Sequence, residues 1–327
     1  MPLSSTPNRR AVLTGAGLTL LSACSPKAGS GDLKGLTLRV ATYKGGVQHL
    51  FEAAGVANAP YRIANSEFGS GNLITEAINA KAIDIGSMSE IPPIFVAGRQ
   101  TLLRQIAVLR GDVNNQVALV PKDSDIHGLG ELKGKRVGYI PATTSHYFLL
   151  RVLEEQGLSF ADIKPAPLGP QDGLAAFGRG ALDAWFIFGV HSNLARSRYG
   201  ARVLTTALGR LSGDYIYAAL KDAIDDPVRR AAIVDYLGRV RRVYEWAEGH
   251  TQAYAEILSK VTGVPAALYL QQHAERSGPT VLGPVDDQAI RAQQQVADTF
   301  ARAGVIHGKP DLAPLWDRSF TPELSPK

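Results

Sequence analysis

The sequence predicts an α/β protein with mainly parallel sheets, and three observations support that prediction. Short β-rich runs alternate with helix-like patterns over the first two thirds of the chain, which is typical of strand–helix–strand architecture. Hydrophobic residues make up 45% of the chain and charged residues 20%, the balance of an ordinary globular protein. A length of 327 residues suits two domains or one large domain, at about 100–200 residues per domain.

The strand candidates are short aliphatic or β-branched runs bounded by turn residues. In chain order they are residues 36–41, 61–64, 83–85, 117–120, 137–140 and 182–188. Between them, apolar residues recur three or four positions apart, which indicates helices. These helical stretches are residues 47–54, 73–78, 91–97 and 149–153, the last of which Gly157 would end.

The last third of the chain has a different pattern. Residues 227–304 are nearly all helical in periodicity, including the stretches 228–248 and 286–303. Asp286 suits a helix N-terminus, where a carboxylate meets the positive end of the helix dipole, and Gly304 suits the C-terminal cap. The sequence therefore predicts a helical block after the alternating region.

The first 23 residues have the pattern of an export signal. Arg9 and Arg10 precede a short apolar stretch, residues 11–21, that small and polar residues interrupt. A positive end before a short apolar core is typical of a cleaved signal peptide. The paired arginines resemble a twin-arginine signal, and the general secretory route is the alternative.

The single cysteine follows directly, in the sequence Leu21-Ser22-Ala23-Cys24. This resembles a bacterial lipobox, in which the cysteine is lipidated and becomes the mature N-terminus; the alternative is a free thiol after an ordinary cleavage site. Residues 24–35 are rich in small and flexible residues, and we expect them to form a tether. The protein is then predicted to lie in the periplasm or at the outer face of the cytoplasmic membrane, held by a lipid anchor.

Composition and missing motifs exclude several function classes. The net charge of +5 falls to 33 − 30 = +3 without the two signal arginines, which gives no case for a nucleic-acid surface. One cysteine excludes an internal disulfide and a CxxC metal site. The P-loop, the dinucleotide fingerprint, HExxH and the GxSxG elbow are all missing. We therefore predict a binding protein without metal or cofactor, and not an enzyme. We also expect it to be a monomer.

Three turns rich in glycine and hydroxyl residues stand where a strand candidate meets a helix candidate. They are Lys44-Gly45-Gly46, Gly69-Ser70-Gly71-Asn72 and Thr143-Thr144-Ser145-His146. The first turn of a helix leaves backbone N–H groups unpaired, so such a junction can bind an oxyanion without a metal. The alternative is helix capping alone, for which Ser, Thr and Asn are suited anyway.

At these and further residues the sequence resembles the aliphatic-sulfonate binding proteins of ABC transporters. The similar segments run in order through most of the chain: 43–46, 76–86, 90–95, 132–138, 144–147, 175–177, 182–185 and 283–287. The broader family also includes binders of taurine, nitrate and thiamine precursors. The resemblance implies that this chain captures a small organic anion, most simply an aliphatic sulfonate, for an ABC permease.

The resemblance also implies a periplasmic-binding-protein-like fold, with two sheets flanked by helices and a ligand cleft between two domains. Domain 1 would comprise residues 36–115 and 208–327, and domain 2 residues 117–205. The chain would cross between them near residues 112–116 and 205–208.

Carried over residue by residue, the resemblance implies a ligand site with three parts. Domain 1 would contribute Tyr43, Lys44, Gly45, Gly46, Gly69, Ser70, Ser89 and Glu90. Domain 2 would hold the sulfonate through Thr143, Thr144, Ser145 and His146. Trp185 and Phe188 would form the apolar wall, although strand alternation allows only one of them to face the cleft unless the strand ends or bulges. We favour Phe188, which is nearer the carboxyl end of its strand.

One departure from the family bears on the ligand. Many relatives continue this strand with a Trp-Asp-Pro-Tyr-like sequence, whereas this chain has Phe188-Gly189-Val190-His191. The missing acid argues against taurine and favours a less polar or larger ligand, and Glu90 is a partial replacement. His146 and His191 could each contact the ligand or simply be satisfied within the fold.

Two other function classes stay open at this point. One is an enzyme on the same fold, of the desulfinase or thiamine-pyrimidine type; these use cysteines, and here the only cysteine lies in the signal region. The other is a sensory binding module for a membrane receptor.

Overall fold

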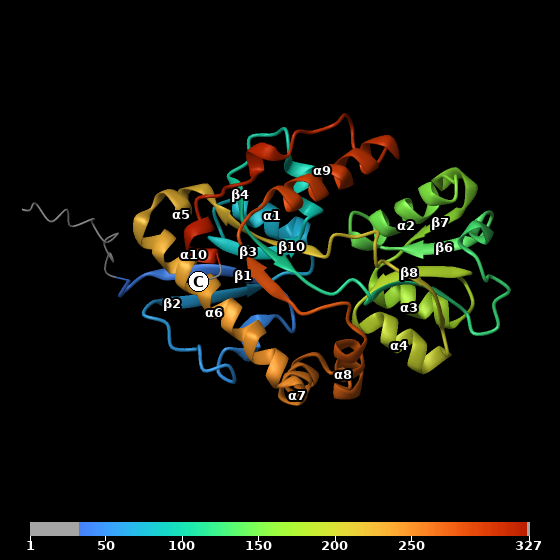
Figure 1. Ribbon diagram of the computed structural model, residues 1–327, viewed down its shortest axis with the longest axis horizontal. Coiled ribbons are helices and arrows are strands. Elements are labelled where there is room, and N and C mark those ends of the chain that lie inside the picture. Colours follow the sequence, from blue (N-terminus) through green and yellow to red (C-terminus); the bar gives the residue numbers. More distant parts are fainter. Residues whose placement is uncertain (1–32, 326–327) are drawn as a thin grey trace, which may run out of the picture.

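The computed structural model describes residues 33–325, which form two separate β-sheets with helices packed on their faces (Figure 1). The strand order is β11-β4-β10-β3-β1-β2 in the six-stranded sheet and β7-β6-β8-β5-β9 in the five-stranded sheet. We call residues 33–110 with 214–325 the first lobe and residues 116–206 the second lobe. The predicted α/β fold with two helix-flanked sheets is confirmed. The prediction of mainly parallel sheets is wrong, because five of the nine strand pairs in the described residues are antiparallel.

The first lobe contains the strands β1 (Thr37–Thr42), β2 (Arg62–Glu67), β3 (Ile85–Ser89), β4 (Leu103–Arg110), β10 (Asp214–Leu220) and β11 (Val281–Gly283). β1 pairs in parallel with β2 and β3. β10 lies antiparallel between β3 and β4. Because β10 runs antiparallel to both of its neighbours, β3 and β4 are parallel to each other. The carboxyl ends of β1, β2, β3 and β4 therefore lie at the same edge of the sheet.

The second lobe contains β5 (Gln116–Val120), β6 (Arg136–Tyr139), β7 (Lys164–Pro167), β8 (Ala184–Phe188) and β9 (Arg202–Thr206). β6 is parallel to both β7 and β8. β5 is antiparallel to β8, and the first residue of β5, Gln116, pairs with the last residue of β8, Phe188. The chain therefore enters the second lobe at the carboxyl edge of β6 and β8.

Two crossings join the lobes through these edges. Residues 111–115 lead from β4 to β5, and residues 207–213 lead from β9 to β10. The two crossings lie side by side, because the Gly111 N–H donates to the Gly213 carbonyl at 3.1 Å. The carboxyl edges of both sheets consequently meet at one junction, which is where ligands bind in open α/β sheets.

The helices cover both faces of each sheet (Figure 1). The α-helices are α1 (Gly71–Asn79), α2 (Thr144–Glu155), α3 (Pro170–Gly178), α4 (Val190–Tyr199), α5 (Lys221–Asp225), α6 (Pro227–Gly249), α7 (Thr251–Thr262), α8 (Ala266–Glu275), α9 (Asp287–Arg302) and α10 (Thr321–Leu324). The 3₁₀-helices are η1 (Val47–Leu50), η2 (Pro92–Val96), η3 (Leu129–Leu132), η4 (Phe160–Asp162) and η5 (Ala313–Leu315).

The predicted helical block is present, with one strand inside it. Asp286 caps α9 by accepting from the Ala289 N–H at 2.9 Å, and Gly304 follows the helix with φ 70°, as its sequence position predicts. The predicted helices at residues 47–54 and 91–97 contain only the short 3₁₀ turns η1 and η2. β11 interrupts the helical block because it pairs with β4.

The lobes also contact each other outside the crossings, at two places (Figure 1). At the first, Tyr147 and Leu150 of α2 pack in one apolar cluster with Phe300 of α9. At the second, Arg196 of α4 forms an ion pair with Glu275 of α8 at 2.6 Å. Both contacts link the two lobes in this structure.

Some predictions fall on residues outside the described range. The export signal with Arg9 and Arg10, and the lipidation site Cys24, precede residue 33. Within residues 33–325, no helix has the length and hydropathy to cross a membrane, and no cluster of His, Cys, Asp and Glu is arranged to hold a metal ion.

Candidate functional site

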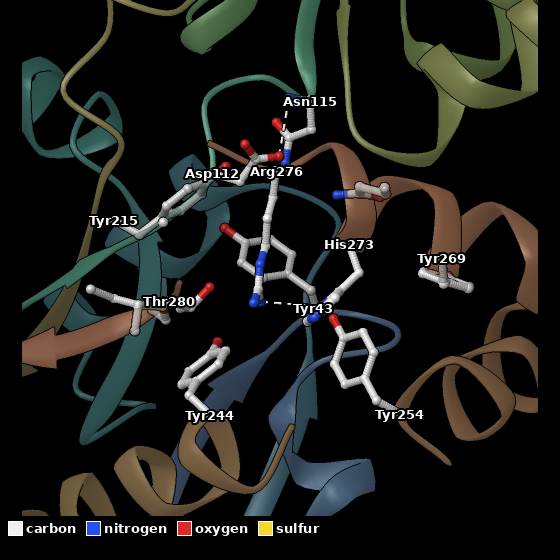
Figure 2. A pocket seen from close by; sticks show the side chains of 14 residues that line it. Tyr43, Asp112, Asn115, Tyr215, Tyr244, Tyr254, Tyr269, His273, Arg276 and Thr280 are labelled. Atoms are coloured by element: carbon white, nitrogen blue, oxygen red, sulfur yellow. Dashed lines mark hydrogen bonds between the residues drawn. The ribbon is translucent and has the colours of Figure 1, made fainter. Parts of the chain in front are cut away.

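A cavity of about 360 Å³ lies between the six-stranded sheet and helices α6 to α8, beside the crossing 111–115 (Figure 2). Sheet residues Ser87 and Leu109 form part of one wall, and α8 contributes Gln272 and His273. Asn115 brings the crossing itself into the lining. The cavity is therefore positioned at the junction where the carboxyl edges of the two sheets meet.

Tyrosines dominate this cavity. Five of the eleven tyrosines in the chain line it: Tyr43 after β1, Tyr215 in β10, Tyr244 in α6, Tyr254 in α7 and Tyr269 in α8. Figure 2 shows Tyr43, Tyr244 and Tyr254 directed toward the same space from different elements. Tyrosine supplies a flat apolar ring with a polar tip, so these side chains can contact both the body and the polar end of an organic ligand.

Most of these hydroxyls have no partner. Tyr269 Oη lies 2.8 Å from Thr262 Oγ1. The hydroxyls of Tyr43, Tyr215, Tyr244 and Tyr254 have no hydrogen-bond partner among residues 33–325. Burial raises the pKa of all four, that of Tyr254 to about 12, so they remain protonated donors at neutral pH.

A cation directly after α8, Arg276, completes the cavity. Arg276 Nη1 lies 2.8 Å from Glu248 Oε1, and the second Arg276 nitrogen also contacts that carboxylate. Arg276 Nη1 further lies 3.2 Å from His273 Nδ1. Burial and the nearby guanidinium lower the pKa of His273, which is therefore neutral at pH 7. Hydroxyl donors beside a guanidinium suit an organic anion.

The predicted residues of domain 1 lie along the carboxyl edge of the six-stranded sheet. Only Tyr43 of this group lines the cavity. Lys44 and Gly69 are exposed, and Gly45 has φ 77°, a conformation that favours glycine. Gly46 precedes η1.

Two further residues of this group stand at strand and helix ends. The exposed Ser70 caps α1, with its Oγ 3.5 Å from the Leu73 nitrogen. Ser89 ends β3 and pairs with Tyr215 of β10. Their polar groups border the junction, and a ligand contact for them remains a prediction.

The predicted residues of the second lobe lie at the start of α2. The Thr143 hydroxyl donates to the Ile140 carbonyl at 2.7 Å. Thr144 is the first residue of α2 and is buried. The backbone N–H groups of Thr144 and Ser145 have no hydrogen-bond partner within the described chain. They are the free donors of a helix N-terminus.

Three predicted ligand contacts need correction. The Ser145 hydroxyl donates to the Phe186 carbonyl at 3.0 Å and accepts from the Ile140 N–H at 3.0 Å, so it is fully engaged within the fold. His146 is buried among Tyr139, Phe160 and Phe300. Burial lowers the pKa of His146 to about 4, so the ring is neutral in this packing.

The third correction concerns the apolar wall. Trp185 is 0% exposed and packs on Phe177 in the core of the second lobe, so it does not face the cleft. Gly138 and Gly173 lie directly against its ring, and a side chain at either position would collide with it. Phe188, by contrast, is half-buried at the carboxyl end of β8.

Glu90 is buried on the other face of the sheet from the tyrosine cavity. It borders a separate cavity of about 300 Å³ and accepts from the Ser212 hydroxyl at 2.9 Å. Burial, with a smaller contribution from Asp214, raises the pKa of Glu90 to about 8. Because Glu90 does not line the tyrosine cavity, it does not replace the acid missing after Phe188.

Sequence reasoning missed most of the cavity. The missed residues belong to the helical block: Tyr244, Tyr254, Tyr269 and Arg276. They form no sequence motif, and each fits the ordinary periodicity of an amphipathic helix. The one usable signal was that this block carries four tyrosines, three of which line the cavity. Their convergence depends on how α6, α7 and α8 fold back on the sheet.

Two lobes joined by two adjacent crossings, with a donor-lined cavity at the junction, define a periplasmic-binding-protein class of solute receptor. The family model described as NMT1/THI5 like matches residues 67–213. The chain is 31% identical over 255 residues to the putative aliphatic sulfonates-binding protein of Escherichia coli (strain K12), covering 77% of this chain and 78% of that protein. The chain therefore belongs to the family of periplasmic aliphatic-sulfonate-binding proteins, as the sequence resemblance predicts.

Solved structures agree with this assignment. The crystal structure of the periplasmic aliphatic sulphonate binding protein SsuA from Escherichia coli matches with a TM-score of 0.79 and 29% identity, over 85% of this chain and 96% of that one. The alkanesulfonate-binding protein SsuA from Xanthomonas axonopodis pv. citri, bound to MOPS, matches with a TM-score of 0.76 and 26% identity, over 88% of this chain and 99% of that one. These relatives are binding proteins, and this protein is a solute-binding protein rather than an enzyme.

Proposed function

We propose that this protein captures an organic sulfonate outside the cytoplasm and delivers it to an ABC permease. The observation that carries the proposal is the tyrosine-lined cavity, in which unpaired hydroxyl donors surround Arg276 at the junction of the lobes. A sulfonate has three oxygen acceptors and a permanent negative charge, so it matches several neutral donors and one guanidinium. The relatives named for aliphatic sulfonates support the same ligand class.

The residues at the carboxyl edges are proposed to close over the ligand. In the first lobe these are Lys44, Gly45, Gly46, Gly69, Ser70 and Ser89, and in the second lobe Thr143, Thr144 and Phe188. What supports this is their position at the junction, since the crossings connect the two edges directly. Closure would be a hinge motion at residues 111–115 and 207–213.

The remaining organisation is also proposed. The domains would be residues 36–115 with 208–327 and residues 117–205, which the membership of strands in the two sheets supports. The protein would act as a monomer, anchored to the membrane by lipid on Cys24, which the sequence Leu21-Ser22-Ala23-Cys24 supports. The Cys24→Ser variant should lose lipidation and leave the membrane fraction, while its ligand affinity stays unchanged.

Calorimetric titration of the purified protein tests the ligand class. We expect hexanesulfonate to bind more tightly than sulfate, nitrate, taurine or a thiamine-type pyrimidine, because only a sulfonate with an apolar body uses both donors and rings. Ligand at about 100 times its dissociation constant should stabilise the fold by about 2.7 kcal/mol, which thermal melting detects independently. Tight binding of nitrate or of the pyrimidine with no response to hexanesulfonate would contradict the proposal.

A further inference from the structure

The walls of the tyrosine cavity are more aromatic than an aliphatic ligand requires. The five tyrosine rings come from the end of β1, from β10 and from three different helices, so they enclose the space from several sides (Figure 2). Leu109 adds a further apolar surface from β4. The volume of about 360 Å³ lies near the lower end of the range for small-molecule sites, about 300–1,000 Å³. The space suits a compact organic body.

Among the described lining residues, the cavity holds one guanidinium, Arg276, and one carboxylate, Asp112. Its Oδ1 accepts from the Asn114 and Ser277 N–H groups at 2.8 and 2.7 Å. Its Oδ2 accepts from the Asn115 N–H at 3.1 Å. Asp112 thus holds the crossing in shape, and an ammonium group in the cavity would be desolvated without a free counter-charge.

From these two features we propose that the cavity selects an arenesulfonate, with its ring between tyrosine rings and its sulfonate oxygens accepting from tyrosine hydroxyls and Arg276. This inference rests on the proposed function and adds the ligand's aromatic body to it. Contact between aromatic rings contributes binding energy beyond the area that is buried. With two or more such contacts, benzenesulfonate should bind at least about tenfold more tightly than cyclohexanesulfonate, which has the same carbon number and no π-system.

The first test is calorimetric titration of the purified full-length mature protein with benzenesulfonate, cyclohexanesulfonate, hexanesulfonate and taurine. We expect benzenesulfonate to bind most tightly and taurine most weakly. Equal or tighter binding of cyclohexanesulfonate or hexanesulfonate overturns the aromatic inference and leaves the proposed function standing. Taurine binding as tight as benzenesulfonate overturns the charge argument. If none of the four binds, the proposed function fails as well.

The second test separates the ring from the hydroxyl of a cavity tyrosine. Tyr254→Phe should weaken both cyclic sulfonates equally and keep their affinity ratio, because it removes only a donor. Tyr254→Leu removes the ring and should bring the ratio toward one. Tyr199→Leu, at an exposed tyrosine outside the cavity, is the matched control and should leave the ratio unchanged. If Tyr254→Leu does not fold, Tyr269→Leu gives the same readout, and an unchanged ratio in a folded leucine variant overturns the inference.

Discussion

Two regions of this protein are rich in hydroxyl groups, the start of α2 and the tyrosine cavity, and they differ in whether those groups are hydrogen-bonded. At the start of α2, the hydroxyls of Thr143 and Ser145 donate to backbone carbonyls of the same lobe. In the tyrosine cavity, the hydroxyls of Tyr43, Tyr215, Tyr244 and Tyr254 have no partner within the described residues. The first region uses its donors to hold the fold, and the second keeps them free beside a cavity. A ligand site is therefore indicated by unsatisfied donors around a space, more than by a hydroxyl-rich motif.

The largest expected effect tests the free donors. Tyr43→Phe combined with Tyr254→Phe removes two unpaired hydroxyls and leaves both rings. A hydrogen bond to a charged group contributes about 1.5–3 kcal/mol, so sulfonate affinity should fall about a hundredfold or more while the melting temperature stays nearly unchanged. Calorimetric titration and thermal melting measure the two quantities. Tyr199→Phe is the control. Equal sulfonate affinity of the double variant and the control would contradict a ligand role for the free tyrosine hydroxyls.

The next prediction concerns the pH dependence of stability that His146, near the start of α2, should cause. The pKa of His146 is lowered from 6.5 to about 4 by burial. Between these values the unfolded chain takes up a proton and the folded protein does not, so stability is lost as the pH falls from about 6.5 to 4. The loss should approach about 3 kcal/mol at pH 4. Denaturant unfolding across this range should show the fall for wild type and for His127→Asn, and a flatter curve for His146→Asn. Identical curves for all three would remove His146 as the cause.

A smaller effect tests whether the side-chain hydroxyls at the start of α2 stabilise the fold or bind the sulfonate. Thr144→Ala combined with Ser145→Ala leaves the Phe186 carbonyl and the Ile140 N–H without their hydroxyl partner. An orphaned buried group costs about 1–3 kcal/mol of stability. We expect little change in affinity, because the free donors at this helix end are the backbone N–H groups of Thr144 and Ser145, which the variant keeps. Thermal melting and titration of the same variant test this. A loss of several hundredfold in affinity without a lower melting temperature would instead place these hydroxyls on the sulfonate.

The smallest effect concerns the contact between α4 and α8. Arg196→Ala removes the ion pair with Glu275 that links the two lobes beside the cavity. Because partly exposed ion pairs contribute about 0.2–1 kcal/mol, sulfonate affinity should fall by about fivefold or less, through a lower population of the closed form. Arg318→Ala, which removes an ion pair with Asp287 inside the first lobe, is the matched control. A larger effect in the control would contradict the role of the α4–α8 contact.

The sequence by itself determined the fold class, six of the eleven strands that the structure describes, the helical block near the end, and the family; β4, β7, β9, β10 and β11 were not predicted. Strand and helix periodicity are local properties, and caps such as Asp286 and Gly304 act within one turn of their helix, so both can be found without tertiary information. The family could be predicted because the similar segments, such as 43–46 and 90–95, occur in the same order along this chain as in the family.

Only the tertiary structure decided which polar groups are free. Ser145 is engaged because the Phe186 carbonyl lies beside it, and Trp185 is in the core because Gly138 and Gly173 make room for its ring. Tyr43 and Arg276 share a cavity although more than 200 positions separate them in the chain. Hydrogen-bond satisfaction and cavity formation depend on neighbours that are distant in sequence, and no local pattern records them.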